Sequence, residues 1–187
     1  MEIYLIRHTK PDCDTGICYG QADIEISGTE EELNSIKNKL TNTKKAIYYT
    51  SPLKRCLKLA EYLGNSKFIS DRRIMEINFG DWELKKWTLI EDQEIFQNWR
   101  NNFVEVSCPN GESFLDLYQR SIEFFEEIIK KDHQEVAIVT HAGVIRCILS
   151  YILEIPLKKV PNLQIDYGGV SKIKILDYVT KVEYINK

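Results

Sequence analysis

Two of the three histidines in this chain follow short apolar segments that are typical of buried strands. Arg7 and His8 directly follow the segment 3–6. His141 follows the segment 136–139, with Thr140 between them. An arginine beside an imidazole lowers the pKa of that imidazole, so Arg7 favours a neutral, nucleophilic His8. A neutral imidazole can attack phosphorus and carry the phosphoryl group covalently, which divides a difficult transfer into two easier steps.

The same chemistry needs cations for the phosphate oxygens and a proton for the leaving oxygen. Arginine matches phosphate with a planar fork of donors, so Arg7 and Arg55 are candidates. His141 could supply a further donor as charge moves onto the equatorial oxygens. A carboxylic acid could protonate the leaving oxygen, which is typically worth about 10²–10⁴ in rate. Taken alone, each residue has a plainer interpretation: a polar strand end, a helix cap, a solvated arginine or, for Glu76, a surface carboxylate.

The composition is that of a globular protein. The chain has 187 residues, of which 43% are hydrophobic and 28% charged, so disorder and a coiled coil are excluded. A length of this order is typical of one domain. The 25 Lys and Arg residues against 28 Asp and Glu give a net charge of −3, with no basic surplus for nucleic acid or a membrane surface. An anion would therefore have to be bound by a few placed residues.

The cysteines and the apolar segments indicate a cytoplasmic protein. The five cysteines are an odd number without a CxxC pair or zinc-ligand spacing, which favours reduced thiols. The N-terminus lacks a basic region ahead of a long apolar run. The most apolar stretch, residues 136–155, contains His141, Arg146 and Glu154, so it fits a buried strand and helix and not a membrane span.

Strands and helices are expected to alternate along most of the chain, which predicts an α/β fold. Thr29 with Glu32 forms a capping-box pattern before a helix, and Ser113 caps another. Ser51 is expected to cap a helix with Pro52 in its first turn. We expect strands at 3–6, 46–49, 68–70 and 136–139, helices at about 30–40, 52–63, 84–101, 113–129 and 142–152, and a hairpin of 171–176 with 182–185 at a sheet edge.

The predicted strands indicate where a ligand would bind. In open α/β sheets, ligand sites lie outside the carboxyl ends of the strands. His8 and His141 each follow such an end, and the strand that ends near Tyr49 leads into the helix that carries Arg55. These three strand ends are therefore expected to form the site.

Four segments in this order resemble the motifs of the histidine phosphatase superfamily, which has the phosphoglycerate-mutase-like fold. They are residues 5–9 (LIRHT), 51–55 (SPLKR), 76–83 (EINFGDWE) and 139–143 (VTHAG). The segment 111–113 (GES) also resembles the start of a cap-side helix in that family. The resemblance covers about residues 2–150. It implies a three-layer α/β/α sandwich with a mostly parallel sheet, formed by residues 1–187 as one domain, in which 71–112 partly cap the site.

The resemblance also implies roles for the site residues. His8 would be the phosphorylated nucleophile, and Arg7, Arg55 and His141 would form the phosphate pocket. Glu76 would be the proton donor and later the base that activates water. Neither a metal nor an organic cofactor is implied. The expected partner is a small-molecule phosphate monoester, without nucleic acid or membrane, and the protein would be a monomer or a homodimer.

One loop is similar to a particular branch of this superfamily. Residues 16–23 read Gly-x-Cys-Tyr-Gly-x-x-Asp, which looks like the α-ribazole phosphatases that remove the 5′-phosphate from α-ribazole phosphate in cobalamin synthesis. By this resemblance Tyr19 and Gln21 would bind the substrate, with Tyr19 as a base-stacking group. A tight turn that packs the loop is the plainer interpretation of Tyr19 and its two neighbours.

The chain departs from the commoner family motif just after His8. Where that motif has Gly, then Glu-Thr and further on Asn, this chain has Thr9, Lys10, Pro11 and Asp14. The missing hydroxyl and amide are donors that the mutases and broad phosphatases use, so their loss disfavours a mutase.

Other functions remain open at this stage. A general small-molecule phosphatase or a phosphoglycerate-mutase-type transferase would use the same residues. A non-catalytic phosphate-binding regulator would need the arginines but neither His8 nor Glu76. A metal hydrolase could be built from His8, Asp12, Asp14 and His141, although these residues lack a known ligand spacing.

Overall fold

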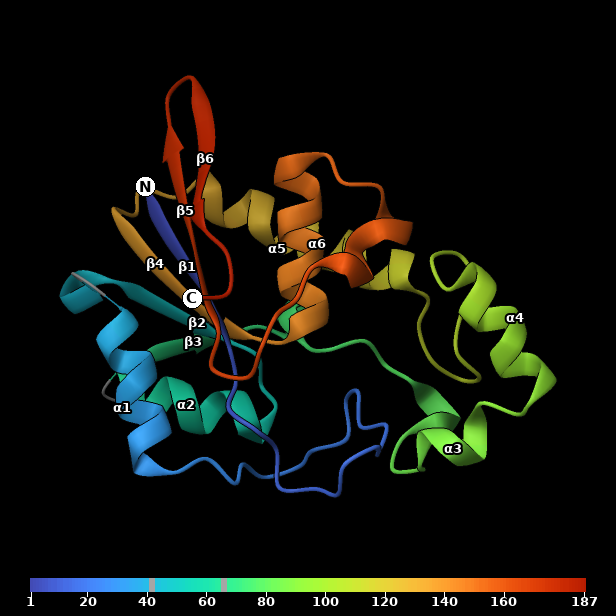
Figure 1. Ribbon diagram of the computed structural model, residues 1–187. Helices are drawn as coiled ribbons and strands as arrows, with labels where there is room; N and C mark the ends of the chain where they lie inside the picture. The colour runs from blue at the N-terminus through green and yellow to red at the C-terminus, as the bar shows by residue number, and fades with distance from the viewer. Residues whose placement is uncertain (41–42, 65–66) are drawn as a thin grey trace.

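A computed structural model describes residues 1–40, 43–64 and 67–187 of the chain. Strands and helices alternate through most of it, as predicted (Figure 1). In chain order the elements are β1 (Glu2–Arg7), α1 (Glu30–Lys39), η1 (Thr43–Lys45), β2 (Ile47–Thr50), α2 (Lys54–Gly64), β3 (Phe68–Ser70), η2 (Arg72–Ile74), η3 (Gly80–Trp82), α3 (Trp87–Ile90), α4 (Glu94–Asn102), α5 (Phe114–Ile129), β4 (Glu135–Thr140), α6 (Ala142–Leu153), η4 (Leu157–Asn162), β5 (Val170–Leu176) and β6 (Val179–Tyr184).

The described strands form a six-stranded sheet in the order β3-β2-β4-β1-β5-β6. The first four strands are parallel, β5 is antiparallel to β1, and β6 pairs with β5 as the predicted edge hairpin. The register between β1 and β4 runs from Glu2 opposite Glu135 to Arg7 opposite Thr140. The chain therefore has the expected mixed, mostly parallel α/β sheet, with β1 and β4 at its centre.

Helices cover both faces of the sheet, because the residues of the central strands alternate between two apolar cores. Ile3 and Leu5 of β1 pack with the buried side chains of α5 and α6. Tyr4 and Ile6 point to the other face and pack with those of α1 and α2. Successive strand residues face opposite sides of a sheet, so one four-residue apolar run supplies both cores. Figure 1 shows the two helix layers on either side of the strands.

Two of the three predicted helix caps are present in the structure, and the third is not. Thr29 and Ser113 form capping boxes with Glu32 and Asp116. The prediction that Ser51 caps the next helix is wrong, because α2 begins only at Lys54. Its first backbone N–H donates instead to Oδ1 of Asp23 in the loop before α1, at 2.8 Å. This carboxylate is far away in sequence, so no local pattern could reveal it.

The single helix expected over 84–101 is divided into α3 and α4. Ile90 and Phe96 pack together in a small aromatic cluster around Trp82. On one straight helix two residues six positions apart would face directions about 120° apart. The break between the helices lets both side chains face Trp82, whose ring centroid lies 5.5 Å from that of Phe96.

The loop from β1 to α1 extends beyond the sheet before it returns. In Figure 1 it runs beneath the ends of β1 and β4 as far as α3. Ile17 there forms an isolated antiparallel bridge with Lys86, and the backbone N–H of Trp87 donates to the Gly16 carbonyl at 2.9 Å. These contacts bring the segment after η3 next to the carboxyl ends of the central strands.

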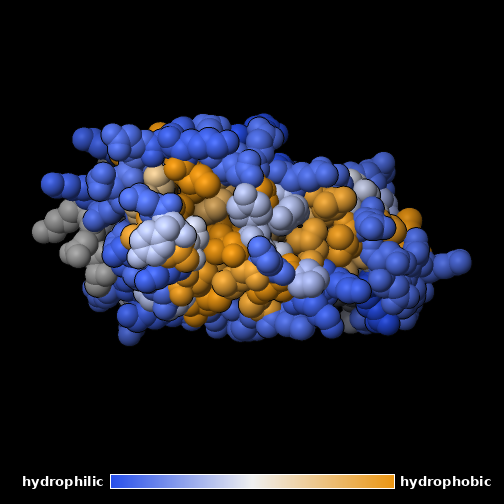
Figure 2. Space-filling view, turned by 90° about the horizontal axis from the view of Figure 1, so that it is seen from above, coloured by the Kyte–Doolittle hydropathy of each residue, from blue (hydrophilic) through white to orange (hydrophobic). Residues whose placement is uncertain are grey.

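Apolar surface is gathered at the opposite end of the molecule. The view from above shows it along the middle, between two polar margins (Figure 2). Exposed apolar side chains at this end include Tyr151 and Leu153 at the end of α6 and Tyr178 in the β5–β6 turn. Within the described residues, none of the helices is long and apolar enough to cross a membrane.

Candidate active site

The two strand-end histidines lie side by side because β1 and β4 are adjacent and parallel. The backbone N–H of His8 donates to the Thr140 carbonyl at 3.1 Å, one residue before His141. The two imidazole ring centroids are 5.1 Å apart, with an interplanar angle of 61°. His8 and His141 are 1% and 0% exposed. The sheet thus places both rings at one buried point beyond its carboxyl edge.

The tautomer of His8 is fixed by its own loop. Its Nδ1 lies 2.6 Å from the backbone oxygen of Thr9. A carbonyl can only accept, so Nδ1 carries the proton and Nε2 keeps a free lone pair. Burial, followed by the charges of Arg55 and Arg7, holds the pKa of His8 well below its ordinary value. The imidazole is therefore neutral with an available lone pair, and burial contributes more to this than the neighbouring arginine from which it was predicted.

His141 is held by one group that follows β2 and one in α2. Its Nε2 lies 2.8 Å from the hydroxyl oxygen of Ser51 and 3.4 Å from Sγ of Cys56. Burial is the first cause that lowers the pKa of His141 well below its ordinary value, with Arg55 and His8 next. Ser51, interpreted from the sequence as a helix cap, is thus the side chain that orients the second imidazole.

Arg55 is completely buried, so its interpretation as a solvated helix residue is wrong. Its Nη1 donates to the Ala22 carbonyl at 2.9 Å, and Nη2 donates to Gly20. Its Nε is buried without a hydrogen-bond partner in the described part of the chain. A buried guanidinium with an unsatisfied donor next to two imidazoles is suited to an anion with several oxygens.

Arg7 is the last residue of β1, directly before His8. Its Nη1 donates to the Ile165 carbonyl at 2.6 Å, and its guanidinium lies 3.8 Å from the ring centroid of Tyr167. The Nε of Arg7 is also buried without a partner among the described residues. Stacking on an aromatic ring fixes the plane of a guanidinium. Tyr167 carried no motif, and only the neighbouring glycines 168–169 mark its loop in the sequence.

Glu76 reaches the site from the irregular segment after η2. Its Oε1 accepts from the backbone N–H of Ile77 at 3.0 Å, and its Oε2 accepts from that of Gly143 at 3.2 Å. A Cβ on residue 143 would clash with Oε1 of Glu76. The glycine two residues after His141 is therefore needed to admit the carboxylate beside the first turn of α6.

The two residues expected to bind substrate are placed differently. The hydroxyl groups of Tyr19 and Tyr167 are 2.6 Å apart, and the Arg55 guanidinium lies 5.3 Å from the Tyr19 ring centroid. The Nε2 of Gln21 donates to the backbone carbonyl of Glu76 at 3.0 Å. Tyr19 therefore lies beside the two arginines, whereas Gln21 contacts the backbone that carries Glu76.

A cleft of about 570 Å³ opens next to these residues. Its walls combine the aromatic side chains with cations, the carboxylate of Glu76 and the loop that follows His8. They are formed by Arg7, Lys10, Pro11, Cys13, Asp14, Thr15, Gly16, Ile17, Cys18, Tyr19, Gly20, Glu76, Phe79, Trp87, Ala142, Arg146 and Tyr167. Arg146 was not predicted as a site residue, although a charge in an otherwise apolar segment was a signal for it.

The described residues contain no group of three or more His, Cys, Asp or Glu side chains that could hold a metal ion. His8, Asp12, Asp14 and His141 therefore do not form the metal site that was considered as an alternative.

The two buried imidazoles are expected to make folding sensitive to pH. Below about pH 6.5 the unfolded chain binds protons at both histidines, whereas the folded state excludes them because both pKa values are lowered. The contribution of the two neutral histidines to the free energy of unfolding is fully present above that pH and is lost as the pH falls. Between pH 7.5 and 5.5 the free energy of unfolding should decrease by about 3 kcal/mol for the pair.

Urea unfolding at these two pH values measures this decrease. His8→Asn should retain about half of it, since one of the two groups remains. If stability changed only below pH 5, carboxylates and not these histidines would control it.

Comparison with known proteins gives one family. The model of the histidine phosphatase superfamily (branch 1) matches residues 3–187. Adenosylcobalamin/alpha-ribazole phosphatase of Escherichia coli (strain K12) is 25% identical over 195 residues, covering 100% of this chain and 96% of that protein. Phosphoserine phosphatase 1 of Hydrogenobacter thermophilus is 28% identical over 182 residues, covering 92% of this chain and 86% of that protein.

The fold also matches a solved structure along its whole length. The alpha-ribazole phosphatase of Shigella flexneri superimposes with a TM-score of 0.89 at 22% identity, covering 100% of this chain and 96% of that one. The two chains therefore share the same sheet and helix arrangement from end to end.

Proposed function

Because this chain belongs to the histidine phosphatase superfamily (branch 1), we propose that it hydrolyses small-molecule phosphate monoesters through a phosphohistidine on His8. The observation that carries this proposal is the bond from Nδ1 of His8 to the Thr9 carbonyl, which leaves Nε2 free to attack. Arg55, which is buried, and Arg7, which is partly buried, lie beside it, and in the described part of the chain the Nε–H of each is buried without a partner. A nucleophile and cations in this arrangement fit a phosphoryl group.

In the first step, Nε2 of His8 forms a bond to phosphorus while the bond from phosphorus to the ester oxygen breaks. Arg7, Arg55 and His141 hold the three remaining phosphate oxygens. Glu76 donates a proton to the departing oxygen, so the product leaves as an alcohol. The side chain is suited to this role because it lines the cleft and is anchored beside His141 by the N–H of Gly143.

In the second step, water attacks the phosphohistidine. Glu76, now ionised, accepts a proton from the water, the P–N bond breaks, and its electron pair returns to Nε2 of His8. Inorganic phosphate is released, and both side chains regain their starting protonation states. The carboxylate and the imidazole thus complete the cycle without any other acid or base.

We favour α-ribazole 5′-phosphate as the substrate. The cleft wall contains the rings of Tyr19, Phe79, Trp87 and Tyr167, which could stack on a heteroaromatic base. A volume of about 570 Å³ is in the range of pockets for drug-sized ligands. The loop pattern around Tyr19 and the name of the Escherichia coli relative support the same substrate.

Phosphoserine is the second candidate. Arg146 lines the same cleft, and its Nε donates to the Leu163 carbonyl at 3.0 Å. Its other nitrogens could pair with a carboxylate. The name of the Hydrogenobacter relative points in this direction. However, an amino acid would fill only a small part of the cleft and would leave the aromatic wall without a partner.

The substrate is tested by phosphate release in EDTA. With α-ribazole 5′-phosphate, phosphoserine and 3-phosphoglycerate at equal concentration, we expect kcat/KM to favour the first by about 100-fold or more, since several stacking contacts of about 1 kcal/mol each add up to this ratio. A preference for phosphoserine would show that the cleft binds the amino acid, with Arg146 as the partner of its carboxylate. Equally slow hydrolysis of all three would agree with phosphatase activity but would exclude both α-ribazole 5′-phosphate and phosphoserine as the preferred substrate.

A further inference from the structure

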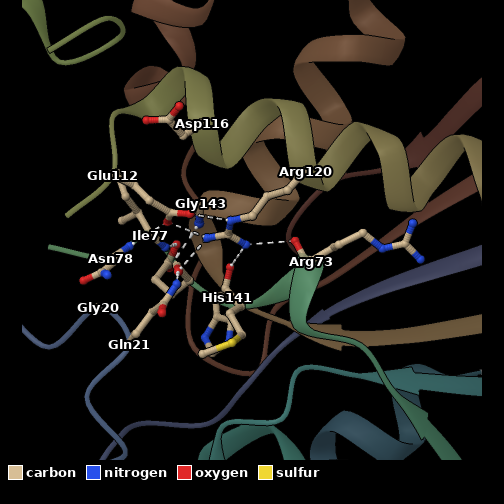
Figure 3. Close-up of polar contacts among 12 residues, drawn as sticks. Gly20, Gln21, Arg73, Ile77, Asn78, Glu112, Asp116, Arg120, His141 and Gly143 are labelled. Carbon is tan, nitrogen blue, oxygen red and sulfur yellow. Dashed lines mark hydrogen bonds and ion pairs between the residues drawn. The ribbon is translucent and has the colours of Figure 1, made fainter. Parts of the chain in front are cut away.

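One arginine of α5 holds three backbone carbonyls of the segment that carries Glu76. Nη1 of Arg120 donates to the carbonyls of Arg73 and Met75 at 2.8 and 2.6 Å, and Nη2 donates to that of Glu76 at 2.8 Å. Figure 3 shows its guanidinium pointing from α5 into this segment. Only 17% of the Arg120 side chain is exposed.

Glu112 fixes the same guanidinium from the other side. Its two carboxylate oxygens accept from Nε and Nη2 of Arg120, each at 2.8 Å. Its Oε2 also accepts from the backbone N–H of Asn78 at 2.9 Å, and its own N–H donates to the Asn78 carbonyl at 2.8 Å. A bidentate pair of this kind is rigid. The Arg120–Glu112 pair therefore holds the backbone on both sides of Glu76.

This anchorage is needed because the segment between η2 and η3 has no regular structure. Its carbonyls would otherwise have few partners from helix or strand bonds. The carboxylate of Glu76 is oriented by two backbone N–H groups, and one of them belongs to Ile77 in the same segment. A shift of this backbone would move the carboxyl group away from the leaving oxygen.

We propose that Arg120, held by Glu112, is the positioning residue that fixes Glu76 for proton transfer. Among the described residues its hydrogen bonds go to backbone oxygens and to Glu112, so it acts through Glu76. A displacement of about 1 Å at a reacting group can cost about 100-fold in rate. This inference rests on the proposed function, in which Glu76 is the proton donor.

The leaving group tests this role. A phosphate ester of an alcohol needs a proton on the leaving oxygen, whereas p-nitrophenolate leaves without one. In Arg120→Met, we expect kcat/KM, which reports the first step, to fall about 30- to 100-fold for an alkyl phosphate that the wild type hydrolyses. For p-nitrophenyl phosphate the decrease should stay within about 3-fold. An equal loss on both substrates, or no loss on either, would overturn the proposal.

Arg73→Met is the matched control. The Arg73 side chain also pairs with carboxylates of α5, namely Glu123 and Glu127, but it runs away from the cluster around Arg120 (Figure 3). The substitution keeps the Arg73 carbonyl that Arg120 binds. Both substrates should therefore retain nearly wild-type rates. A selective loss on the alkyl ester in this control as well would assign the effect to general loosening of α5 and overturn the specific role.

Two further variants separate the possible failures. In a Glu76→Gln background, Arg120→Met should cause no additional loss on the alkyl ester, because both changes remove the same proton transfer. Additive losses would overturn the proposal. If Arg120→Met does not fold, Arg120→Lys replaces it. A lysine keeps the charge but cannot reach three carbonyls and both Glu112 oxygens, so the same selective loss is expected.

Failure of the proposed function would look different. If the wild type hydrolyses neither ester, or if His8→Ala retains its rate, the phosphohistidine mechanism fails. If Glu76→Gln shows the selective loss and Arg120→Met does not, only the positioning role fails.

Discussion

Replacement of His8 by alanine should lower kcat by at least about 10⁴-fold for every phosphate ester, because no other group can receive the phosphoryl group. Of the other histidines, His141 has its Nε2 at the Ser51 hydroxyl. His133 lies away from the site, 3.1 Å from the Tyr49 hydroxyl. His133→Ala is therefore the matched control and should keep nearly full activity.

The measurement combines turnover with chemical trapping. Wild-type protein quenched during turnover of a labelled ester should carry label that is stable in alkali and lost in mild acid, and His8→Ala should carry none. Circular dichroism must show that the variant is folded. The sequence suggested a polar strand end whose loss would leave the core intact, but His8 is 1% exposed, so some stability will be lost as well. A variant that kept most of its activity would rule out the phosphohistidine.

Replacement of Glu76 by glutamine should lower kcat/KM, which reports the first step, by about 10²–10⁴-fold for alkyl phosphates and far less for p-nitrophenyl phosphate. The amide cannot donate a proton to the leaving oxygen as a carboxylic acid does. It is also a poorer partner for the two backbone N–H groups that the carboxylate accepts from, at Ile77 and Gly143. One of these N–H donors will face the amide nitrogen, which cannot accept a hydrogen bond, so the side chain will be held less firmly.

A series of esters with different leaving-group pKa values measures the effect. The kcat/KM of the variant should depend more steeply on leaving-group pKa than that of the wild type. Glu94→Gln, which changes an exposed carboxylate in α4, should leave the dependence unchanged. An equal loss of kcat/KM on all esters would show that Glu76 acts in binding and does not protonate the leaving group.

The central part of the site could be predicted from the sequence alone. Arg7 and His8 directly follow one apolar strand segment and His141 follows another, and parallel strands place their carboxyl ends at one edge. The capping boxes at Thr29 and Ser113 were also recognisable, since each joins residues only three positions apart. Signals of this kind are local: a strand pattern, a helix cap, or residues adjacent in the chain.

The tertiary structure decided which other groups surround these residues. Ser51 contacts His141 across 90 positions, Tyr167 stacks on Arg7 from the loop before β5, and Arg120 holds the Glu76 backbone from α5. The sheet order and the packing of α5 set these contacts, and no spacing along the chain encodes them. The sequence by itself therefore determined the α/β fold and the residue types at the centre of the candidate site. Their burial, their hydrogen-bond partners and the shape of the cleft follow only from the folded chain, because they arise between segments that are distant until the sheet assembles.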